Sequence, residues 1–141
     1  MKQFFDTSVL VAAFFSFHIH HNPSLKRFAS AEKSTSACGI HSLAEVYSAM
    51  TRLPVRPPIP PEQALLFLDE IRTRLTIVTL TPEEYFKTIQ SAAAKGYTGG
   101  RVYDALLLAC ADKFQSQAIY TWNLKQFQAL SPKLADKIQN P

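Results

Sequence analysis

Three acidic residues, Asp6, Glu45 and Asp104, lie either in an apolar stretch of the sequence or near the expected start of a helix. Asp6 directly follows the apolar N-terminal segment, and Asp104 lies in Val102–Ala111, which has almost no polar face. A buried carboxylate costs free energy unless a cation or good hydrogen bonds compensate it. Carboxylates that converge repel one another and are stable only around cations. These residues therefore predict a cation site.

The ligand types narrow the choice of ion. The three side chains offer hard oxygen ligands, and no Cys or His pattern accompanies them, so the set favours Mg²⁺ or Mn²⁺ over Zn²⁺. Such centres activate water and neutralise charge on a scissile phosphate. The pattern is typical of phosphoryl-transfer chemistry.

Each carboxylate also has a purely local interpretation, which the sequence leaves open. Asp6 has the residue type of a helix N-cap, a role compatible with metal binding because one oxygen can cap while the other meets the ion. Ser42-Leu43-Ala44-Glu45 has the spacing of a capping box, which would use Glu45 to close a first helical turn. Arg101 lies three residues before Asp104 and could pair with it on one helical face.

A second set of polar residues could support the carboxylates. Asn123 follows an apolar segment in Thr121-Trp122-Asn123, where its neutral side chain could orient a water molecule or cap the next helix. Ser8 and Thr121 are candidates for hydrogen bonds to the ligands or to a phosphate. The histidines of His18-Ile19-His20-His21 are crowded in an expected loop, which favours solvent exposure over metal binding.

Strands and helices alternate along the chain. We expect strands at 2–5, 35–38, 75–80 and 118–121, and helices at 8–15, 22–33, 42–52, 62–72, 82–95, 101–114, 124–130 and 132–138. This order is typical of βαβ units with a parallel sheet, whose ligands bind at the carboxyl ends of the strands. Asp6, Asn123 and the helix that carries Glu45 should meet at that edge.

Several local signals set the expected helix boundaries. Asn22-Pro23 is typical of a cap followed by a first-turn proline, and Thr81-Pro82-Glu83-Glu84 combines a first-turn proline with a capping-box spacing. The proline-rich segment from 53 to 61 predicts a connector without regular structure. The helix at 62–72 is amphipathic, with four apolar residues expected on one side: Leu65, Leu66, Leu68 and Ile71.

The composition indicates a globular protein. Hydrophobic residues make up 47% and charged residues 18% of the sequence, which excludes a disordered chain, and the length fits one domain, residues 1–141. The formal net charge of +4 suits a polyanionic partner, although charge alone is a weak signal. Cys38 and Cys110 lie in apolar contexts, which indicates small buried hydrophobes in a reducing compartment.

No membrane segment is predicted. No apolar run approaches the roughly 18 residues that a membrane span needs. The apolar stretch from Val9 to Phe17 lacks a small-residue cleavage site and follows Asp6, so it does not indicate a signal peptide. We therefore expect a cytoplasmic protein.

Four motifs, taken together, resemble the PIN-domain nucleases, in particular the VapC-type toxins of bacterial toxin–antitoxin pairs. They fall in the family's order and span nearly the whole chain: Phe5–Leu10, Ser42–Tyr47 with Thr51–Pro54, Gly99–Leu106 and Thr121–Phe127. The resemblance implies a three-layer α/β/α fold with a central, mainly parallel sheet. It also implies endonucleolytic cleavage of RNA with one or two Mg²⁺ or Mn²⁺ ions.

By motif, Asp6, Glu45 and Asp104 resemble the family's metal-binding carboxylates. The family's fourth acidic position aligns with Asn123, where many members carry Asp; this departure bears on a second metal and not on the first. Members are commonly homodimers, neutralised by a small antitoxin whose tail enters the active-site groove. A basic residue near the site often contacts RNA or antitoxin, and Arg52 and Arg101 are the candidates here.

Two other interpretations are weighed against a nuclease. A degenerate PIN domain could bind RNA or a protein partner without catalysis, and Asn123 is the residue that allows this. A receiver-like Mg²⁺ module would need adjacent acidic residues after its first strand, whereas Thr7 and Ser8 follow Asp6. DNA remains open as an alternative substrate.

Overall fold

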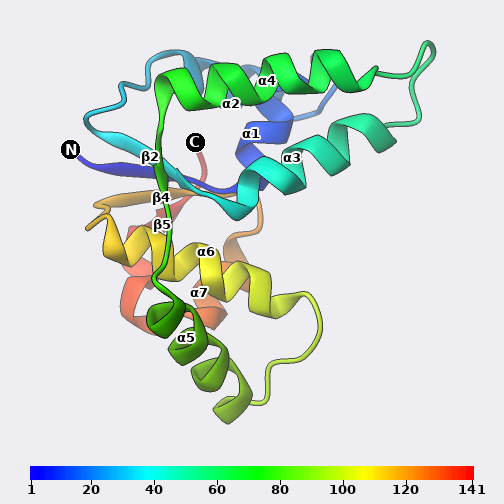
Figure 1. Cartoon of the computed structure of the whole chain (residues 1–141). Coiled ribbons are helices and arrows are strands. Elements are labelled where there is room, and N and C mark those ends of the chain that lie inside the picture. Colours follow the sequence, from blue (N-terminus) through cyan, green and yellow to red (C-terminus); the bar gives the residue numbers. More distant parts are fainter.

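A five-stranded parallel sheet forms the centre of the molecule (Figure 1). The computed structural model describes all 141 residues. The strand order is β3-β2-β1-β4-β5, and every neighbouring pair is parallel. The strands are short: β1 (Gln3–Phe5), β2 (Ser36–Gly39), β3 (Thr76–Val78), β4 (Ala118–Tyr120) and β5 (Ile138–Gln139).

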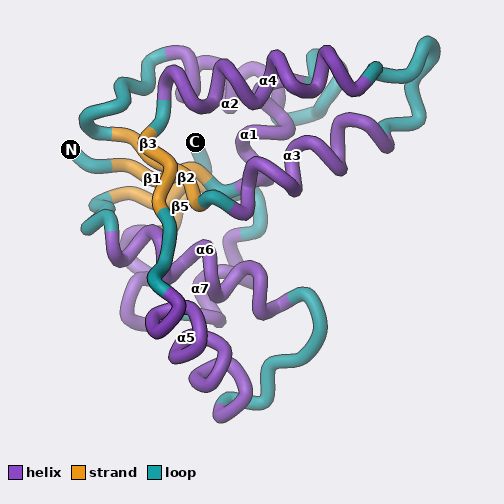
Figure 2. Tube along the Cα trace, viewed as in Figure 1, coloured by secondary structure: helices purple, strands orange, loops and turns teal.

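Helices cover both faces of this sheet, which confirms the three-layer α/β/α fold (Figures 1 and 2). One layer consists of α1 (Thr7–Phe14), α2 (His21–Ala29), α3 (His41–Arg52) and α4 (Pro61–Arg74). The other consists of α5 (Pro82–Ala94), α6 (Arg101–Lys113), α7 (Leu124–Leu130) and a 3₁₀ helix (Pro132–Lys137). No helix is long and apolar enough to cross a membrane.

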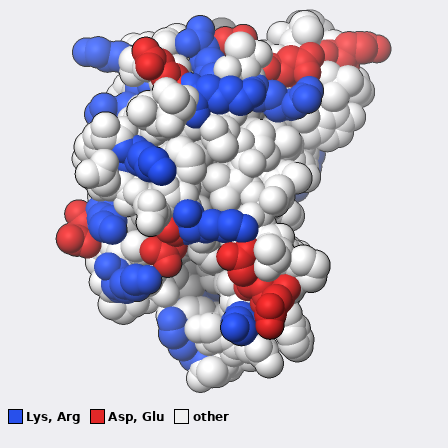
Figure 3. Space-filling view, turned by 60° about the vertical axis from the view of Figure 1, so that its left-hand side comes forward, with Lys and Arg blue, Asp and Glu red and all other residues white.

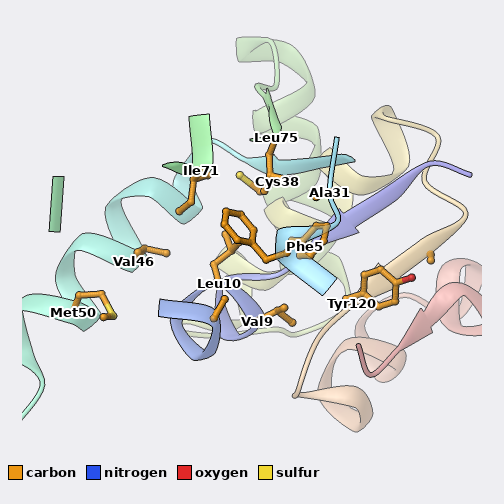
Figure 4. Close-up of a cluster of buried hydrophobic side chains, with 13 residues drawn as sticks. Phe5, Val9, Leu10, Ala31, Cys38, Val46, Met50, Ile71, Leu75 and Tyr120 are labelled. Carbon is orange, nitrogen blue, oxygen red and sulfur yellow. The ribbon is translucent and has the colours of Figure 1, made fainter. Parts of the chain in front are cut away.

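Strand side chains alternate between the two layers, as the period of two requires. Phe5, Cys38 and Tyr120 pack with α1 to α4, whereas their preceding neighbours Phe4, Ala37 and Ile119 pack with α6 and α7. Figure 4 shows Phe5 and Tyr120 beside Val9 and Leu10 of α1. Each fully buried large apolar side chain contributes roughly 1.5–3 kcal/mol, so the strand residues fix both helical layers on the sheet.

The topology brings distant segments to one sheet edge. β1 lies between β2 and β4, and the three strands run in the same direction. α1 begins at Thr7, α3 at His41 and α7 at Leu124, each two to four residues beyond its strand. The carboxyl ends of these central strands therefore carry Asp6, the start of α3 and the segment from Thr121 to Asn123.

Most local predictions are confirmed. The capping box of α5 forms as expected, with Thr81 and Glu84 each bonding the other's backbone N–H. The proline-rich connector between α3 and α4 has no helix or strand. Cys38 and Cys110 are free and buried, and burial raises the pKa of the Cys38 thiol to about 12.

Three local predictions are wrong in part: those for α2, for α4 and for the C-terminus. The expected helix at 22–33 begins at His21, without a side-chain cap, and ends at Ala29. In α4, Leu68 and Ile71 pack toward the core as expected, but Leu65 and Leu66 are 55% and 64% exposed, and the smaller Ala64 is buried instead of them. The helix expected at 132–138 forms as a 3₁₀ helix that ends at Lys137, and Ile138 begins a short fifth strand, which pairs with β4 and has no local signal.

The histidine cluster is more buried than expected. His20 stacks on Trp122 at 3.8 Å between ring centroids, and the His21 ring lies 2.8 Å from the Ala12 carbonyl oxygen. His18, His20 and His21 are each partly buried. Long-range stacking therefore replaces the solvent exposure that the local sequence indicates.

Candidate metal centre and active site

Asp6 is held rigidly at the junction of β1 and α1. It caps α1, and its Oδ2 accepts hydrogen bonds from the Ser8 amide at 3.3 Å and the Ser8 hydroxyl at 2.7 Å. Thr121, at the end of β4, donates a third bond to the same oxygen at 2.9 Å. Because all three bonds end on Oδ2, the geometry leaves Oδ1 for a further ligand. Both interpretations of Asp6, cap and ligand, are thus compatible.

Ser8 and Thr121 connect Asp6 to the backbone beyond β4. The Trp122 amide donates to Ser8 Oγ at 3.0 Å, and the Asn123 amide donates to Thr121 Oγ1 at 3.0 Å. Thr121 is fully buried. The two hydroxyls therefore orient the carboxylate. Burial raises the pKa of Asp6, against the effect of these hydrogen bonds.

Glu45 lies on the second turn of α3, facing Asp6. The Ser42 and Thr7 hydroxyls are 2.8 Å apart, and Thr7 donates to Glu45 Oε1 at 2.9 Å. The capping-box interpretation is wrong, because α3 begins at His41 after Ile40 and has no side-chain cap. Ser42 is instead buried against Thr7. Burial raises the pKa of Glu45, and the charge of Asp6 adds to this effect.

Asp104 lies in the first turn of α6 and makes no ion pair. Arg101 is placed over the ring of Tyr97, 4.2 Å from its centroid, so the alternative in which it pairs with Asp104 does not occur. Burial raises the pKa of Asp104 from 3.8 to about 6, with the charges of Asp6 and Glu45 as further causes. The negative charge of Asp104 therefore has no positively charged partner in the protein, and a bound cation or a proton would neutralise it.

The three carboxylates form one electrostatic unit, with Asp6 from the junction of β1 and α1, Glu45 from α3 and Asp104 from α6. The negative charges of Asp6 and Glu45 both raise the pKa of Asp104, and the charge of Asp6 also raises the pKa of Glu45. No group of three or more His, Cys, Asp and Glu side chains is arranged to hold a metal ion by itself. Mg²⁺ commonly uses one or two carboxylates and keeps several waters. The chemistry of the donor set, which consists of carboxylate oxygens alone, suits Mg²⁺.

Asn123 is exposed and contributes its backbone to the site. Its amide bonds Thr121, but its side chain does not cap α7, although Asn123 occupies the N-cap position. The alternative role as a helix cap is therefore wrong. The Asn123 side chain is free to turn toward solvent at the end of β4.

Two cavities adjoin the carboxylates, and each has a basic side chain. Arg52 lines one, together with Thr7, His41, Glu45 and Tyr103. Arg101, Lys125 and Gln126 line the other, together with Asp104. On the face drawn in Figure 3, basic and acidic side chains are interleaved.

Sequence reasoning missed three residues of this region: Thr7, His41 and Lys125. Thr7 could have been found, because it immediately follows Asp6 in the first motif and its hydroxyl can reach a neighbouring acid. His41 and Lys125 reach the cavities only through the packing of α3 and α7 beside α6, which no local pattern indicates.

A PIN-domain model matches residues 4–129, and this span contains all the candidate site residues. The chain belongs to the PIN-domain family. Its relatives within that family are VapC ribonucleases. Ribonuclease VapC40 of Mycobacterium tuberculosis is 33% identical over 106 residues, which cover 72% of each chain. Ribonuclease VapC27 of the same species is 32% identical over 113 residues, or 79% of this chain and 78% of the relative.

Solved structures share the fold of this PIN domain. VapC20 of Mycobacterium tuberculosis, a toxin that cleaves the sarcin–ricin loop, aligns over 91% of this chain and 95% of its own, with a TM-score of 0.73 and 18% identity. VapBC2 from Rickettsia felis, bound to a promoter DNA fragment, has a TM-score of 0.66 and 20% identity, covering 99% of this chain and 98% of its own. The predicted resemblance to VapC-type PIN domains is therefore confirmed.

Proposed function

We propose that this PIN domain, residues 1–141, is a Mg²⁺- or Mn²⁺-dependent endoribonuclease that acts as the toxin of a toxin–antitoxin pair in the cytoplasm. The observation that carries the proposal is that the fold gathers Asp6 after β1, Glu45 on α3 and Asp104 at the start of α6, with Thr7 beside Asp6 bonded to Glu45. The charge of Asp6 accordingly raises the pKa of both Glu45 and Asp104. The ribonuclease names of VapC40 and VapC27 support RNA as the substrate.

The three carboxylates would have different roles in such a site. Asp6, oriented by Ser8 and Thr121, would hold the ion through Oδ1, and Glu45 and Asp104 would complete or water-mediate its binding. The bound ion supplies an activated water and charge neutralisation at the scissile phosphate. The Asn123 side chain would hydrogen-bond a water near the site.

The basic residues beside the carboxylates would bind the substrate. Arg52 lines one cavity together with Glu45, and Arg101 and Lys125 line the other together with Asp104. Arg and Lys displace counterions from phosphates and so position a strand without reading its sequence. We infer that the RNA backbone crosses the carboxylates from one cavity to the other.

Cleavage of structured RNA by the purified chain tests this function. We expect cleavage with Mg²⁺ or Mn²⁺ and none in EDTA. Asp104→Asn should cleave at least about 100-fold more slowly, which is the scale of removing one group that stabilises transition-state charge. Asp112→Asn is the matched control, because Asp112 lies on the same helix in an exposed pair with Lys133. Mn²⁺ binding by calorimetry should weaken in the first variant only.

A second candidate function is RNA or protein binding without catalysis. Asn123 favours it, because a neutral amide replaces an acidic side chain at the end of β4. RNA binding by the wild-type chain without cleavage at any Mn²⁺ concentration would support this candidate. Equal cleavage rates for wild type and Asp104→Asn would instead refute the assigned role of Asp104. Matched DNA and RNA oligomers decide between the two nucleic acids.

We further propose a cognate antitoxin and a homodimer as protein partners. The VapBC-1 structure from nontypeable Haemophilus influenzae, at a TM-score of 0.63 and 15% identity, shares the fold over 99% of this chain and 98% of its own. Two adjacent leucines of α4, Leu65 and Leu66, are 55% and 64% exposed. Contiguous exposed apolar surface is typical of protein interfaces. Light scattering alone and with the upstream-encoded protein would measure both associations.

A further inference from the structure

An aromatic pair joins the two helices that carry Glu45 and Asp104. The rings of His41, at the start of α3, and Tyr103, in the first turn of α6, are stacked with centroids 4.9 Å apart and an interplanar angle of 14°. Tyr103 is nonetheless 45% exposed. Because His41 lies against one face of the tyrosine ring, the exposed surface belongs to its other face and edge.

The pair borders the acidic unit directly. Both rings line the same cavity as Thr7, Glu45 and Arg52, and Tyr103 immediately precedes Asp104 in the chain. Gly100 lies beside the ring without a side chain, and a methyl group there would come within 4.0 Å of Tyr103 Cδ2. Tyr103 therefore exposes part of its ring at the cavity that a substrate strand would occupy.

A second stacked pair shows what a purely structural stack looks like here. Phe14 and Phe67 have centroids 4.8 Å apart and an interplanar angle of 21°, and both pack against the buried cluster beneath α1 and α4. Both members of that pair are hydrocarbon rings and partly buried. Tyr103 instead keeps nearly half of its surface in solvent, beside Glu45 and Arg52.

We propose that Tyr103, supported from behind by His41, is a stacking platform for an RNA base next to the scissile phosphate. Aromatic rings in grooves with basic side chains bind single-stranded nucleic acid by stacking on bases while the basic groups bind phosphates. Arg52, in the same cavity, supplies the basic group. The proposal rests on the proposed RNA substrate and deepens it, because it requires an unpaired base at the cleavage site.

Binding of two labelled decamers in Ca²⁺ buffer, followed by fluorescence anisotropy, tests the platform. One is decaadenylate, and the other has the same ribose-phosphate backbone without bases. We expect Tyr103→Ala to weaken decaadenylate binding about tenfold, within the range of base–aromatic stacking. Binding of the abasic strand should not change. Tyr103→Phe and Tyr103→Trp should bind decaadenylate about as well as wild type.

A matched control variant and a kinetic measurement distinguish base stacking on Tyr103 from a role in which its ring only holds α3 against α6. Phe86→Ala removes an aromatic ring of 54% exposure from α5, outside both cavities, and should leave both affinities unchanged. In RNA cleavage, Tyr103→Ala should raise KM with little change in kcat, because the base contact exists before the reaction. A ring that only braces α3 against α6 would lower kcat through Glu45 and Asp104.

The outcomes distinguish this proposal from the proposed function. Equal weakening of both decamers in Tyr103→Ala, or no weakening of either, would overturn the platform even if the enzyme cleaves RNA. Equal binding of the two decamers by the wild-type chain would overturn it as well. A base-dependent loss in Tyr103→Ala, combined with no cleavage by wild type in any metal, would retain the platform and overturn the nuclease.

Discussion

The acidic unit has one anchored side and one unanchored side. At the end of β1, Asp6 accepts three hydrogen bonds on one oxygen and sits between β4 and α1. At the start of α6, Asp104 accepts no hydrogen bond from the protein and is subject to the charges of Asp6 and Glu45. The difference teaches that this fold fixes one carboxylate in advance and leaves another to be oriented by what binds.

The largest expected difference between Asp6 and Asp104 is the loss of stability when the side chain can no longer accept hydrogen bonds. Asp6→Ala should be about 2 kcal/mol less stable than Asp6→Asn, because alanine removes the cap and leaves the Ser8 and Thr121 hydroxyls without their acceptor. At Asp104 the same two variants should differ by no more than about 0.7 kcal/mol, the spread of helix propensities. Urea unfolding in EDTA measures all four.

An equal difference in unfolding free energy between the Ala and Asn variants at both positions would contradict this contrast between Asp6 and Asp104. Such a result would mean that Asp104 also has a protein partner. Asp112→Ala and Asp112→Asn give the baseline for an exposed aspartate on α6.

A smaller effect is expected from pH. Because the pKa of Asp104 rises from 3.8 to about 6 on folding, the folded chain binds its proton more tightly than the unfolded chain does. Its contribution to stability is therefore full below pH 3.8 and is lost as the pH rises through about 6. The loss should be about 1–2 kcal/mol, less than the whole shift implies, since the side chain is partly exposed.

Thermal unfolding across this pH range in EDTA measures the loss. Asp104→Asn should remove that part of the slope, and Mg²⁺ should restore stability at pH 7 more than at pH 5. An unchanged slope in Asp104→Asn would assign the pH dependence to other groups.

The smallest effect concerns the anchor of Asp6. Thr121→Val should cost about 1 kcal/mol and lower metal affinity, because it deletes a bond to Asp6 and leaves the Asn123 amide without its acceptor. Thr73→Val, an exposed threonine of α4 bonded to its own helix, should change stability by less than about 0.5 kcal/mol. Equal costs for the two variants would show that Thr121 adds no anchoring.

Residue type and local context were enough to find the carboxylates. Asp6 follows an apolar strand and Asp104 interrupts an apolar helix, so their chemistry was visible in the amino-acid sequence. The interpretation of their neighbours was less successful. The Ser42 hydroxyl meets Thr7, 35 residues away, and Arg101 turns to Tyr97 instead of Asp104. Local spacing suggests a partner, but side chains bind whichever group the packing brings nearest.

Apolar periodicity, capping residues and proline positions act over a few residues, so the sequence by itself determined the alternating element order, the α/β class and the three acidic motifs. Only the tertiary structure decided that β1 lies between β2 and β4, that Thr121 anchors Asp6 across 115 positions, and that His41 stacks on Tyr103. These contacts depend on strand order and helix packing, which follow from burying both faces of the sheet at once.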